Sequence, residues 1–373
     1  MSAERRSIPA AQPFMSGNEA KYVADCLETG WISSIGRYVS EFESVFAEFC
    51  GVRHAATCNN GTSALHLALL AMGVEAGDEV LVPTLTYIAT ANAVRYCGAN
   101  PVFVDSEPTT MNLDPADIEH RITPRTRGII AVHLYGHPAA MSQINGVARR
   151  HGLWVIEDAA EAHGARCDGR RTGALADVAT FSFFGNKIVT TGEGGMVTTD
   201  DDEIDARVRL LRGQGMDTEH RYWFPVVGFN YRMTNIQAAL GLAQLEMIDT
   251  QLTRRREIGE WYDEDLRRLG AAVTLPPHEP WADPVNWLYT VRLNSGGEAE
   301  RDALMAALAS TGVETRPVFY PVHTMPPYGG SNGEYPVAED LAARGVSLPT
   351  HAALTRDDVA YVAEHLAGHL EDD

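Results

Sequence analysis

The pattern of hydrophobic and polar positions changes once along the chain, after Gly195. Before that point, short apolar runs alternate with stretches of helical periodicity. The expected strands are Ala55–Cys58, Glu79–Val82, Pro101–Val104, Gly128–His133 and Trp154–Glu157, with helices such as Ser63–Met72 and Ile88–Tyr96 between them. Continuous apolar strands that alternate with helices are typical of βαβ units around a buried parallel sheet. We therefore predict an α/β fold whose ligands bind at the carboxyl ends of the strands.

A long helix is expected to lead out of this α/β unit. Thr234 and Gln237 have the spacing of a capping box, in which each side chain bonds a backbone N–H of the first helical turn. The helical pattern that follows runs without glycine or proline from Gln244 to Arg268, and only Gly241 weakens it near its start. A helix of this length can leave one domain and enter another, because each residue adds about 1.5 Å.

A smaller α+β unit is predicted beyond the long helix. Its expected elements are a strand at Trp287–Leu293, a helix at Glu298–Ser310, a strand at Val313–Val318 and a closing helix after Thr355. We interpret Trp287, Leu288 and Tyr289 as part of a core strand. The chain is accordingly expected to have two domains, a large ligand-binding domain over residues 1–250 and a small C-terminal domain over residues 251–373.

Composition and charge narrow the class of protein. Hydrophobic residues make up 45% of the 373 residues and charged residues 21%, which excludes disordered and fibrous chains. The formal net charge is −20, from 30 basic and 50 acidic side chains. A surface this negative repels phosphate backbones and anionic lipid, so we expect neither a nucleic-acid nor a membrane partner. Any anionic ligand must then be held by local geometry.

The N-terminal stretch and the cysteines indicate the compartment. No apolar region of a signal peptide and no run of about 18 apolar residues occurs in the sequence. The five cysteines are an odd number, and no two have the C-x₂-C spacing. This usage predicts reduced thiols, with neither a disulfide framework nor a zinc site. We expect a cytoplasmic protein without a bound metal.

The first candidate functional segment is Thr57–Ser63, where a predicted strand breaks at Gly61 and two hydroxyls, of Thr62 and Ser63, begin a helix. Free N–H groups and the positive end of the helix dipole make such a place an anion site. An ordinary N-cap is the alternative that these residues leave open.

The second segment is the strand expected from Trp154, which has two adjacent acids, Glu157 and Asp158, at its carboxyl end. A buried strand does not leave two carboxylates without compensation. One carboxylate at the carboxyl end of a strand suits a cationic ligand group. Alternatively, the two acids face solvent at the sheet edge or cap the next helix.

The third segment places Lys187 between the aromatic run Phe181–Phe184 and the glycine-rich run Gly192–Gly195. Lys21 and Lys187 are the only lysines, so the other 28 basic residues are arginines. An amine can lose its proton when desolvated and form a Schiff base, which a guanidinium cannot do. A solvated surface lysine is the alternative. A phosphate cradle, an acid for a pyridinium nitrogen and a Schiff-base lysine are together the set that pyridoxal 5′-phosphate (PLP) requires.

Several motifs of the chain resemble those of the DegT/DnrJ/EryC1/StrS family of PLP-dependent sugar aminotransferases. They are Thr57–Ser63, Glu157–Ala165, Ser182–Gly195, Asn230–Ala238, Gly30–Phe42 and Thr315–Tyr328. The resemblance covers nearly the whole chain. It implies the PLP-dependent transferase fold of type I, similar to aspartate aminotransferase, with a mostly parallel central sheet and a smaller C-terminal α+β domain. It is strongest to members that transfer the amino group of L-glutamate to the C4 ketone of a nucleotide-linked 4-keto-6-deoxyhexose.

The resemblance also implies roles for residues around the cofactor ring. Lys187 carries PLP covalently as an aldimine and later moves protons. Asp158 pairs with the protonated pyridine nitrogen, and Tyr87 stacks on the face of the ring. Glu161 stands beside the phenolic oxygen, where many members of the family have glutamine.

Further roles concern the phosphate and the substrate. By resemblance, Gly61, Thr62 and Ser182 hold the phosphate, and Asn230 reaches it from the neighbouring subunit of a homodimer. The residues that resemble the substrate pocket of the family are Trp31, Ser33, Ser34, Arg316, Tyr320 and His323.

Other activities use the same apparatus and stay open at this point. The nearest are amino transfer to a 3-keto sugar nucleotide and amino transfer to a cyclitol. The dehydratase branch has a histidine in place of the lysine, so Lys187 disfavours it. A non-catalytic binding module with this fold is disfavoured by the intact set of Lys187, Asp158 and Ser182.

Overall fold

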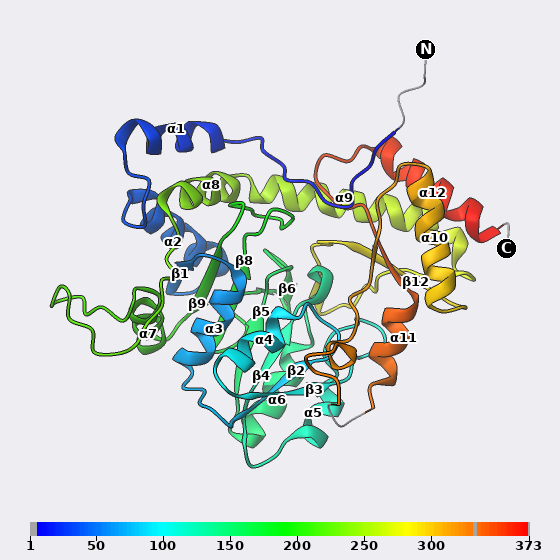
Figure 1. Cartoon of the computed structure of the whole chain (residues 1–373). Coiled ribbons are helices and arrows are strands. Elements are labelled where there is room, and N and C mark those ends of the chain that lie inside the picture. Colours follow the sequence, from blue (N-terminus) through cyan, green and yellow to red (C-terminus); the bar gives the residue numbers. More distant parts are fainter. Residues whose placement is uncertain (1–5, 331–333, 372–373) are drawn as a thin grey trace.

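A seven-stranded mixed sheet forms the centre of the larger part of the molecule (Figure 1). The computed structural model describes residues 6–330 and 334–371. The strands of the sheet, in chain order, are β1 (His54–Cys58), β2 (Glu79–Pro83), β3 (Asn100–Val104), β4 (Thr126–Val132), β5 (Trp154–Asp158), β8 (Val178–Ser182) and β9 (Gly195–Thr199). Their spatial order is β1-β9-β8-β5-β4-β2-β3. Only β9 runs against its two neighbours in this sheet, which confirms the mostly parallel sheet predicted from the sequence.

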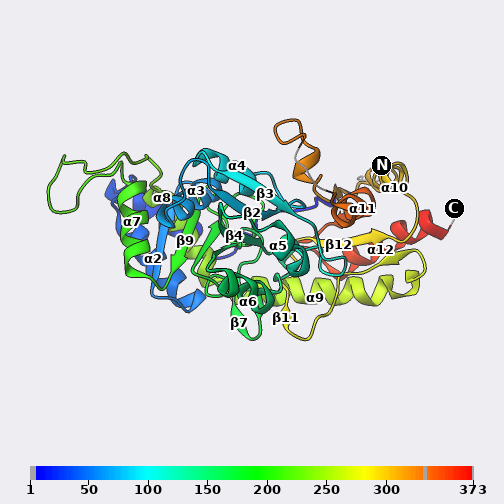
Figure 2. The same cartoon turned by 90° about the horizontal axis from the view of Figure 1, so that it is seen from below.

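Helices cover both faces of this sheet, with α3 and α4 on one side and α6 on the other (Figure 2). The helices of this part are α1 (Glu19–Thr29), α2 (Arg37–Cys50), α3 (Gly61–Ala71), α4 (Ala89–Tyr96), α5 (Pro115–Arg121), α6 (Met141–His151), α7 (Asp202–Arg212) and α8 (Asn235–Glu246), with a 3₁₀ turn η1 (Leu134–Gly136) after β4. Because parallel strands end at the same edge of the sheet, the segments that follow β1, β2, β5 and β8 meet there. The site described below is built from these segments.

The predicted long helix is two helices, α8 and α9 (Ile248–Leu266), which run almost end to end across the molecule (Figure 1). The capping box of Thr234 and Gln237 is present at the start of α8. The interruption falls at Met247 and not at Gly241, so the expectation of a single helix from Gln244 is wrong in this detail. Gly241 stays helical because the ring of Phe42 occupies the place where a side chain would lie, 2.6 Å from an added Cβ.

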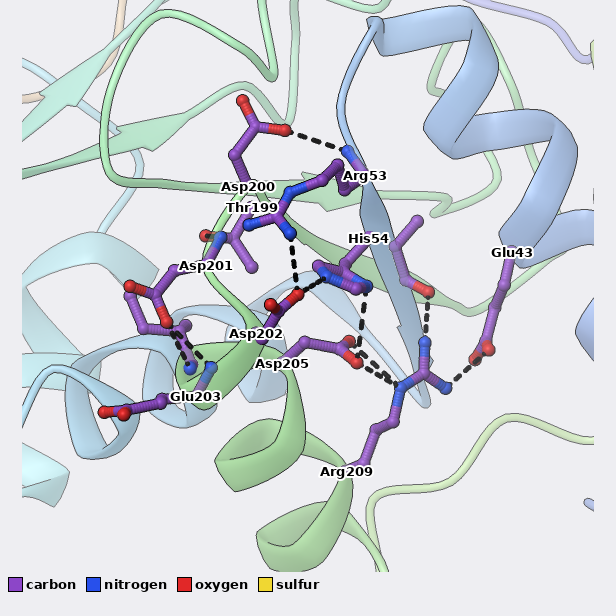
Figure 3. A network of polar contacts seen from close by, with 12 residues as sticks. Glu43, Arg53, His54, Thr199, Asp200, Asp201, Asp202, Glu203, Asp205 and Arg209 are labelled. Carbon is purple, nitrogen blue, oxygen red and sulfur yellow. Dashed lines mark hydrogen bonds and ion pairs between the residues drawn. The ribbon is translucent and has the colours of Figure 1, made fainter.

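A polar network fastens α7 to β1 and α2 at one end of the sheet (Figure 3). Arg209 of α7 donates to Glu43 of α2 and to Asp205 within its own helix. His54 of β1 lies 2.6 Å from the carboxylate of Asp202. Glu43 also accepts the N–H of Thr57, so this network holds β1 close to the segment that leads into α3.

The smaller part of the molecule has its own antiparallel sheet and its own hydrophobic core. The sheet has the order β10-β12-β14-β13, and its strands are β10 (Val273–Thr274), β12 (Tyr289–Leu293), β13 (Arg316–Pro317) and β14 (Gly345–Leu348). Its helices are α10 (Glu298–Ser310), α11 (Pro336–Arg344) and α12 (Arg356–Glu371), with 3₁₀ turns η2 (Arg267–Leu269) and η3 (Val322–Thr324). A minor sheet joins β6 (Arg166–Cys167), β7 (Arg170–Arg171) and β11 (Ala282–Asp283).

Two strand predictions need correction here. The strand expected at Val313–Val318 is only Arg316–Pro317 long, and Val313 instead pairs with Ile8 in an isolated bridge. The strand expected from Trp287 begins at Tyr289.

The predicted boundary at residue 250 falls inside the first turn of α9, so no loop marks it, and the division into two domains stays a prediction. None of the helices in the described part of the chain has both the length and the apolar character to cross a membrane.

Candidate active site

A cavity of about 540 Å³ opens at the carboxyl edge of the large sheet. Its volume is in the range of small-molecule and cofactor sites. The predicted site residues that line it are Gly61, Thr62, Tyr87, Asp158, Glu161, Ser182, Lys187 and Arg316. The tertiary structure therefore brings together segments that are far apart in the sequence.

One end of the cavity is the N-terminus of α3. The side chain of Asn60, the N-cap, accepts a hydrogen bond from the N–H of Ser63 at 2.8 Å. The N–H groups of Gly61 and Thr62, the first two helical residues, have no partner within the helix. Ser182, at the end of β8, packs directly on Gly61, because a Cβ at Gly61 would lie 2.7 Å from the Cβ of Ser182. Only glycine allows the strand and the helix terminus to meet in this way, and the result is a cradle of N–H and O–H donors that suits a phosphate.

Asp158 stands at the carboxyl end of β5 and is 6% exposed. Its carboxylate accepts the hydroxyl of Thr90 at 2.7 Å and the N–H of Ala160 at 3.3 Å. Burial raises its pKa. A buried carboxylate with so few donors is suited to a cationic group brought by a ligand.

Lys187 lines the same cavity, with its side chain 12% exposed. Its Nζ is 3.5 Å from Oε1 of Glu161, and burial lowers the pKa of the amine. The other oxygen of Glu161 accepts the N–H of Tyr135 at 2.8 Å. The two side chains form a buried pair of opposite charge at the centre of the site.

Trp287 is a site residue that the sequence interpretation assigned to the core. Its ring lies under the Lys187 ammonium, 3.9 Å from Nζ to the ring centroid, and its Nε1–H donates to the carbonyl of Asn186 at 2.8 Å. The prediction of a core strand drew attention away from this role, since Trp287 is buried but precedes the strand. No spacing in the sequence connects residue 287 with residue 187. Four further residues line the cavity and were not predicted as site residues, namely Thr90, Asn186, Tyr231 and Phe319.

Glu157, the other acid of the strand, belongs to the interior of the protein. It is fully buried, and its two oxygens accept the N–H groups of Gly173, Leu175 and Ala176. The Nε2 of His133 lies 3.0 Å from the same carboxylate. The solvent-facing alternative for this acid is therefore wrong, and its partners are all internal.

The remaining predicted site residues do not line the cavity of this chain. Trp31, Ser33 and Ser34 lie in the loop between α1 and α2, and Asn230 is exposed in the segment before α8. His323 is held between Thr84, at 2.6 Å from its Nδ1, and Glu339, at 3.1 Å from its Nε2. Tyr320 lines an adjoining cavity of about 310 Å³, which shares Arg316, Tyr87 and Trp287 with the main one.

The residues present fit PLP. The cradle at α3 offers N–H and hydroxyl donors for a phosphate, Asp158 offers a buried carboxylate for a pyridinium, and Lys187 lines the same cavity. An amine whose pKa is lowered by burial is the group that a carbonyl of the cofactor requires. The fold and this donor set define a PLP-dependent transferase of the aspartate aminotransferase type.

Comparison with known proteins gives the particular family. Residues 13–367 match the DegT/DnrJ/EryC1/StrS aminotransferase family, and the chain belongs to that family. A GDP-perosamine synthase of Caulobacter vibrioides is 58% identical over 353 residues, which cover 94% of this chain and 95% of that protein. A GDP-perosamine synthase of Escherichia coli O157:H7 is 48% identical, with 96% and 97% covered. The crystal structure of S. venezuelae DesV in complex with a ketimine intermediate has a TM-score of 0.90 and 39% identity, with 95% of this chain and 94% of that chain covered. The chain is thus a PLP-dependent sugar aminotransferase, as its motifs predicted.

Proposed function

We propose that this enzyme transfers the amino group of L-glutamate to the C4 ketone of a GDP-linked 4-keto-6-deoxyhexose, which is the reaction of a GDP-perosamine synthase. The observation that carries the proposal is the 58% identity with such a synthase along nearly the whole of both chains. The related synthases of Escherichia coli and Vibrio cholerae, at 48% and 42% identity, support the same choice of nucleotide and carbon. Amino transfer at C3 or to a cyclitol is disfavoured on the same ground.

The roles of the residues follow from their places in the cavity. Bound PLP supplies an electron sink for the charge that develops when a proton leaves the substrate carbon. In our proposal Lys187 holds the cofactor and then moves that proton, since burial lowers the pKa of its amine and makes the proton easier to lose. Asp158 holds a proton at the pyridine nitrogen. Gly61, Thr62 and Ser182 bind the phosphate.

The substrate side is proposed to be formed by residues around the cavity mouth. Tyr87 is 60% exposed at the wall shared by the two cavities, so its ring is open to contact with a ligand. Arg316 lines both cavities and supplies a positive charge for an anionic substrate group. Tyr320 would contact the substrate from the adjoining cavity. His323 would act on it only by moving away from Thr84 and Glu339.

We also propose that the enzyme works as a homodimer. The segment between α7 and α8 stands away from the sheet, at the left of Figure 1, and exposes Tyr222 (72%), Trp223 (65%) and Val227 (89%). Exposed apolar side chains in one patch are typical of an interaction surface. Asn230 lies in the same segment, five residues before α8, and does not line the cavity of its own chain. A second copy would cover the patch and receive Asn230 beside its phosphate cradle, and Trp31, Ser33 and Ser34 would enter the site in the same way.

A substrate panel tests the proposed activity. Purified enzyme with PLP and L-glutamate is assayed with GDP-, dTDP- and UDP-linked 4-keto-6-deoxyhexoses, and with a 3-keto sugar nucleotide. We expect kcat/KM to be highest for the GDP-linked 4-keto sugar, by at least about tenfold. Faster turnover of the 3-keto sugar, or of another nucleotide, would contradict the proposal. Sedimentation of the same sample, with Trp223→Ser as the comparison, tests the dimer.

A further inference from the structure

The pair of Lys187 and Glu161 carries an inference about where a proton goes. The two side chains are 12% and 6% exposed, and Nζ lies 3.5 Å from Oε1. The Oε2 atom of Glu161 is occupied by the N–H of Tyr135 at 2.8 Å. Oε1 is therefore the oxygen that faces the amine. Since both groups are withdrawn from water, a proton that leaves Lys187 has a carboxylate as its nearest acceptor.

The carboxylate is held in this place by a strained support. Tyr135 has φ 54° and ψ 16°, in the left-handed region that an aromatic residue rarely adopts. Its hydroxyl accepts the N–H of Phe319 at 2.9 Å, and its ring stacks with those of Trp287 and Phe319. Contacts on both sides thus fix the backbone that binds Glu161. Strain that is maintained at such a position indicates a demand for accurate placement.

The charges around the pair favour a neutral Glu161 once Lys187 has lost its charge. The titratable or charged groups that face the pair from neighbouring elements are Asp158, His163, Arg316 and the phenol of Tyr135. Burial raises the pKa of Glu161, and the negative charge of Asp158 raises it further, while the Lys187 ammonium lowers it. When that ammonium is consumed, its opposing effect disappears. Asp158 competes poorly for the proton, because it receives the Thr90 hydroxyl and makes no hydrogen bond to Lys187.

We propose that Glu161 accepts the proton of the Lys187 ammonium when the amine attacks a carbonyl, and that it remains a carboxylic acid while Lys187 is covalently engaged. The inference rests on the role of Lys187 in the proposed function. The step is balanced: one proton passes from the ammonium to Oε1, and the electron pair of that N–H bond forms the new bond to the carbonyl carbon. The two protons left on nitrogen depart with the carbonyl oxygen as water, so that the C=N product is neutral and Glu161 keeps its proton. The net charge of the pocket does not change. The resulting acid presents an O–H donor toward the lysine side of the cavity.

Difference infrared spectroscopy tests this step without a measurement of turnover. PLP is added to cofactor-free enzyme, and the spectrum before addition is subtracted. We expect a new carbonyl band of a protonated carboxylic acid, which is absent in Glu161→Gln and present in the matched control Glu75→Gln, where the same charge is removed from an exposed position. The glutamine keeps an oxygen for the Tyr135 N–H, so the variant should fold. A wild-type spectrum without the band, or a band that persists in Glu161→Gln, would overturn the inference.

The pH titration of the cofactor absorbance is a second readout. Replacement of a neutral acid by a neutral amide should shift the midpoint by less than about one pH unit. Removal of a contacting negative charge would shift it by more, and that result would also overturn the inference. The proposed function fails separately, if Lys187→Ala retains the absorbance of covalently bound PLP. Covalent PLP at Lys187 without the acid band contradicts the proton step alone.

Discussion

The two acids at the carboxyl end of β5 are adjacent in sequence but lie in contrasting surroundings. Glu157 is fully buried and is surrounded by donors of the protein itself, three backbone N–H groups and the ring of His133. Asp158 is 6% exposed and receives one hydroxyl and one long N–H contact. Successive side chains of a strand point to opposite faces, so neighbours enter different environments.

The comparison shows that a buried charge can have a structural role or a functional role, depending on how many donors surround it. A buried carboxylate with a complete set of donors holds loops together, and here Glu157 fixes the segment from Gly173 to Ala176. A buried carboxylate with unused acceptor capacity costs free energy until a ligand supplies the partner. Asp158 and Glu161 are of the second kind, and both have a raised pKa as a result of burial. The incompletely satisfied groups therefore mark the candidate active site.

The largest effect is expected from Lys187→Ala. This change removes the amine that lies beside the incompletely satisfied carboxylates and that can itself react. Turnover should fall by at least about a thousandfold, because proton transfer and covalent attachment are both lost. The absorbance of covalently bound PLP should disappear. Lys21→Ala, on α1, is the matched control and should keep both. Turnover close to that of wild type would show that Lys187 is not the reactive amine.

Asp158→Asn and Glu157→Gln separate the two kinds of acid. Asp158→Asn should lower kcat by about 10²–10³-fold, because the charge that stabilises the pyridinium is lost. Glu157→Gln should instead lower the free energy of unfolding by about 1–3 kcal/mol, since its amide NH₂ must face an N–H donor. Denaturant titration and steady-state kinetics measure both effects. Equal loss of activity and stability in the two variants would contradict the comparison.

The pH dependence of the stability of the cofactor-free protein gives a further test of the contrast between Asp158 and Glu157. Because the pKa of Asp158 is raised in the folded state, the folded protein retains that proton to higher pH than the unfolded chain does. Its contribution to stability is therefore present in acid and is lost as the pH rises through the raised pKa. Cofactor-free Asp158→Asn should be at least as stable as wild type at neutral pH, and this advantage should disappear below about pH 4. Denaturant midpoints at several pH values give the test.

A smaller effect is expected at the phosphate cradle, where partners are again left for a ligand. Gly61→Ala places a Cβ 2.7 Å from the Cβ of Ser182, so strand and helix terminus must separate. A misplacement of this kind should weaken PLP binding by about tenfold, equivalent to about 1.4 kcal/mol. Gly368→Ala is the control, because nothing lies within 4 Å of the added Cβ. Unchanged PLP affinity in Gly61→Ala would exclude the cradle as the phosphate site.

The smallest effect is expected for Trp287→Phe. The phenylalanine keeps a ring beneath Lys187 but loses the hydrogen bond from Nε1 to the carbonyl of Asn186. Stability should fall by about 1 kcal/mol, and kcat should fall only a few-fold. A much larger loss of kcat would mean that the indole itself takes part in the reaction. The aromatic contact of Lys187 would then have to be counted with Asp158 and Glu161 among the functional features of the site.

Local patterns in the sequence predicted much of the architecture. The alternation of apolar runs and helices predicted the mostly parallel sheet, and the Thr234 capping box begins α8. The predictions were weakest where tertiary contacts override local preference. Gly241 does not interrupt the helix because Phe42 packs on it, and β13 is short because Val313 pairs with Ile8 from the N-terminal segment instead of joining the small sheet.

The candidate site was predicted in the same uneven way. The residues that end β1, β5 and β8 were found, because a polar residue after an apolar strand is visible in the sequence. Trp287 was missed as a site residue, since its contact with Lys187 joins positions 100 residues apart. Asn230 and Trp31 do not line the cavity of their own chain, and their roles stay predictions for the homodimer.

The sequence by itself determined the class of fold, the scarcity of lysine and the order of the motifs, because strand periodicity, composition and capping are local properties. Only the tertiary structure decided which of two adjacent acids is satisfied and which is not. That difference depends on the loop from Gly173 to Ala176 and on the alternation of side chains along β5. The number of donors around a buried charge is set by segments that meet only when the chain is folded, and this number separates Glu157 from Asp158.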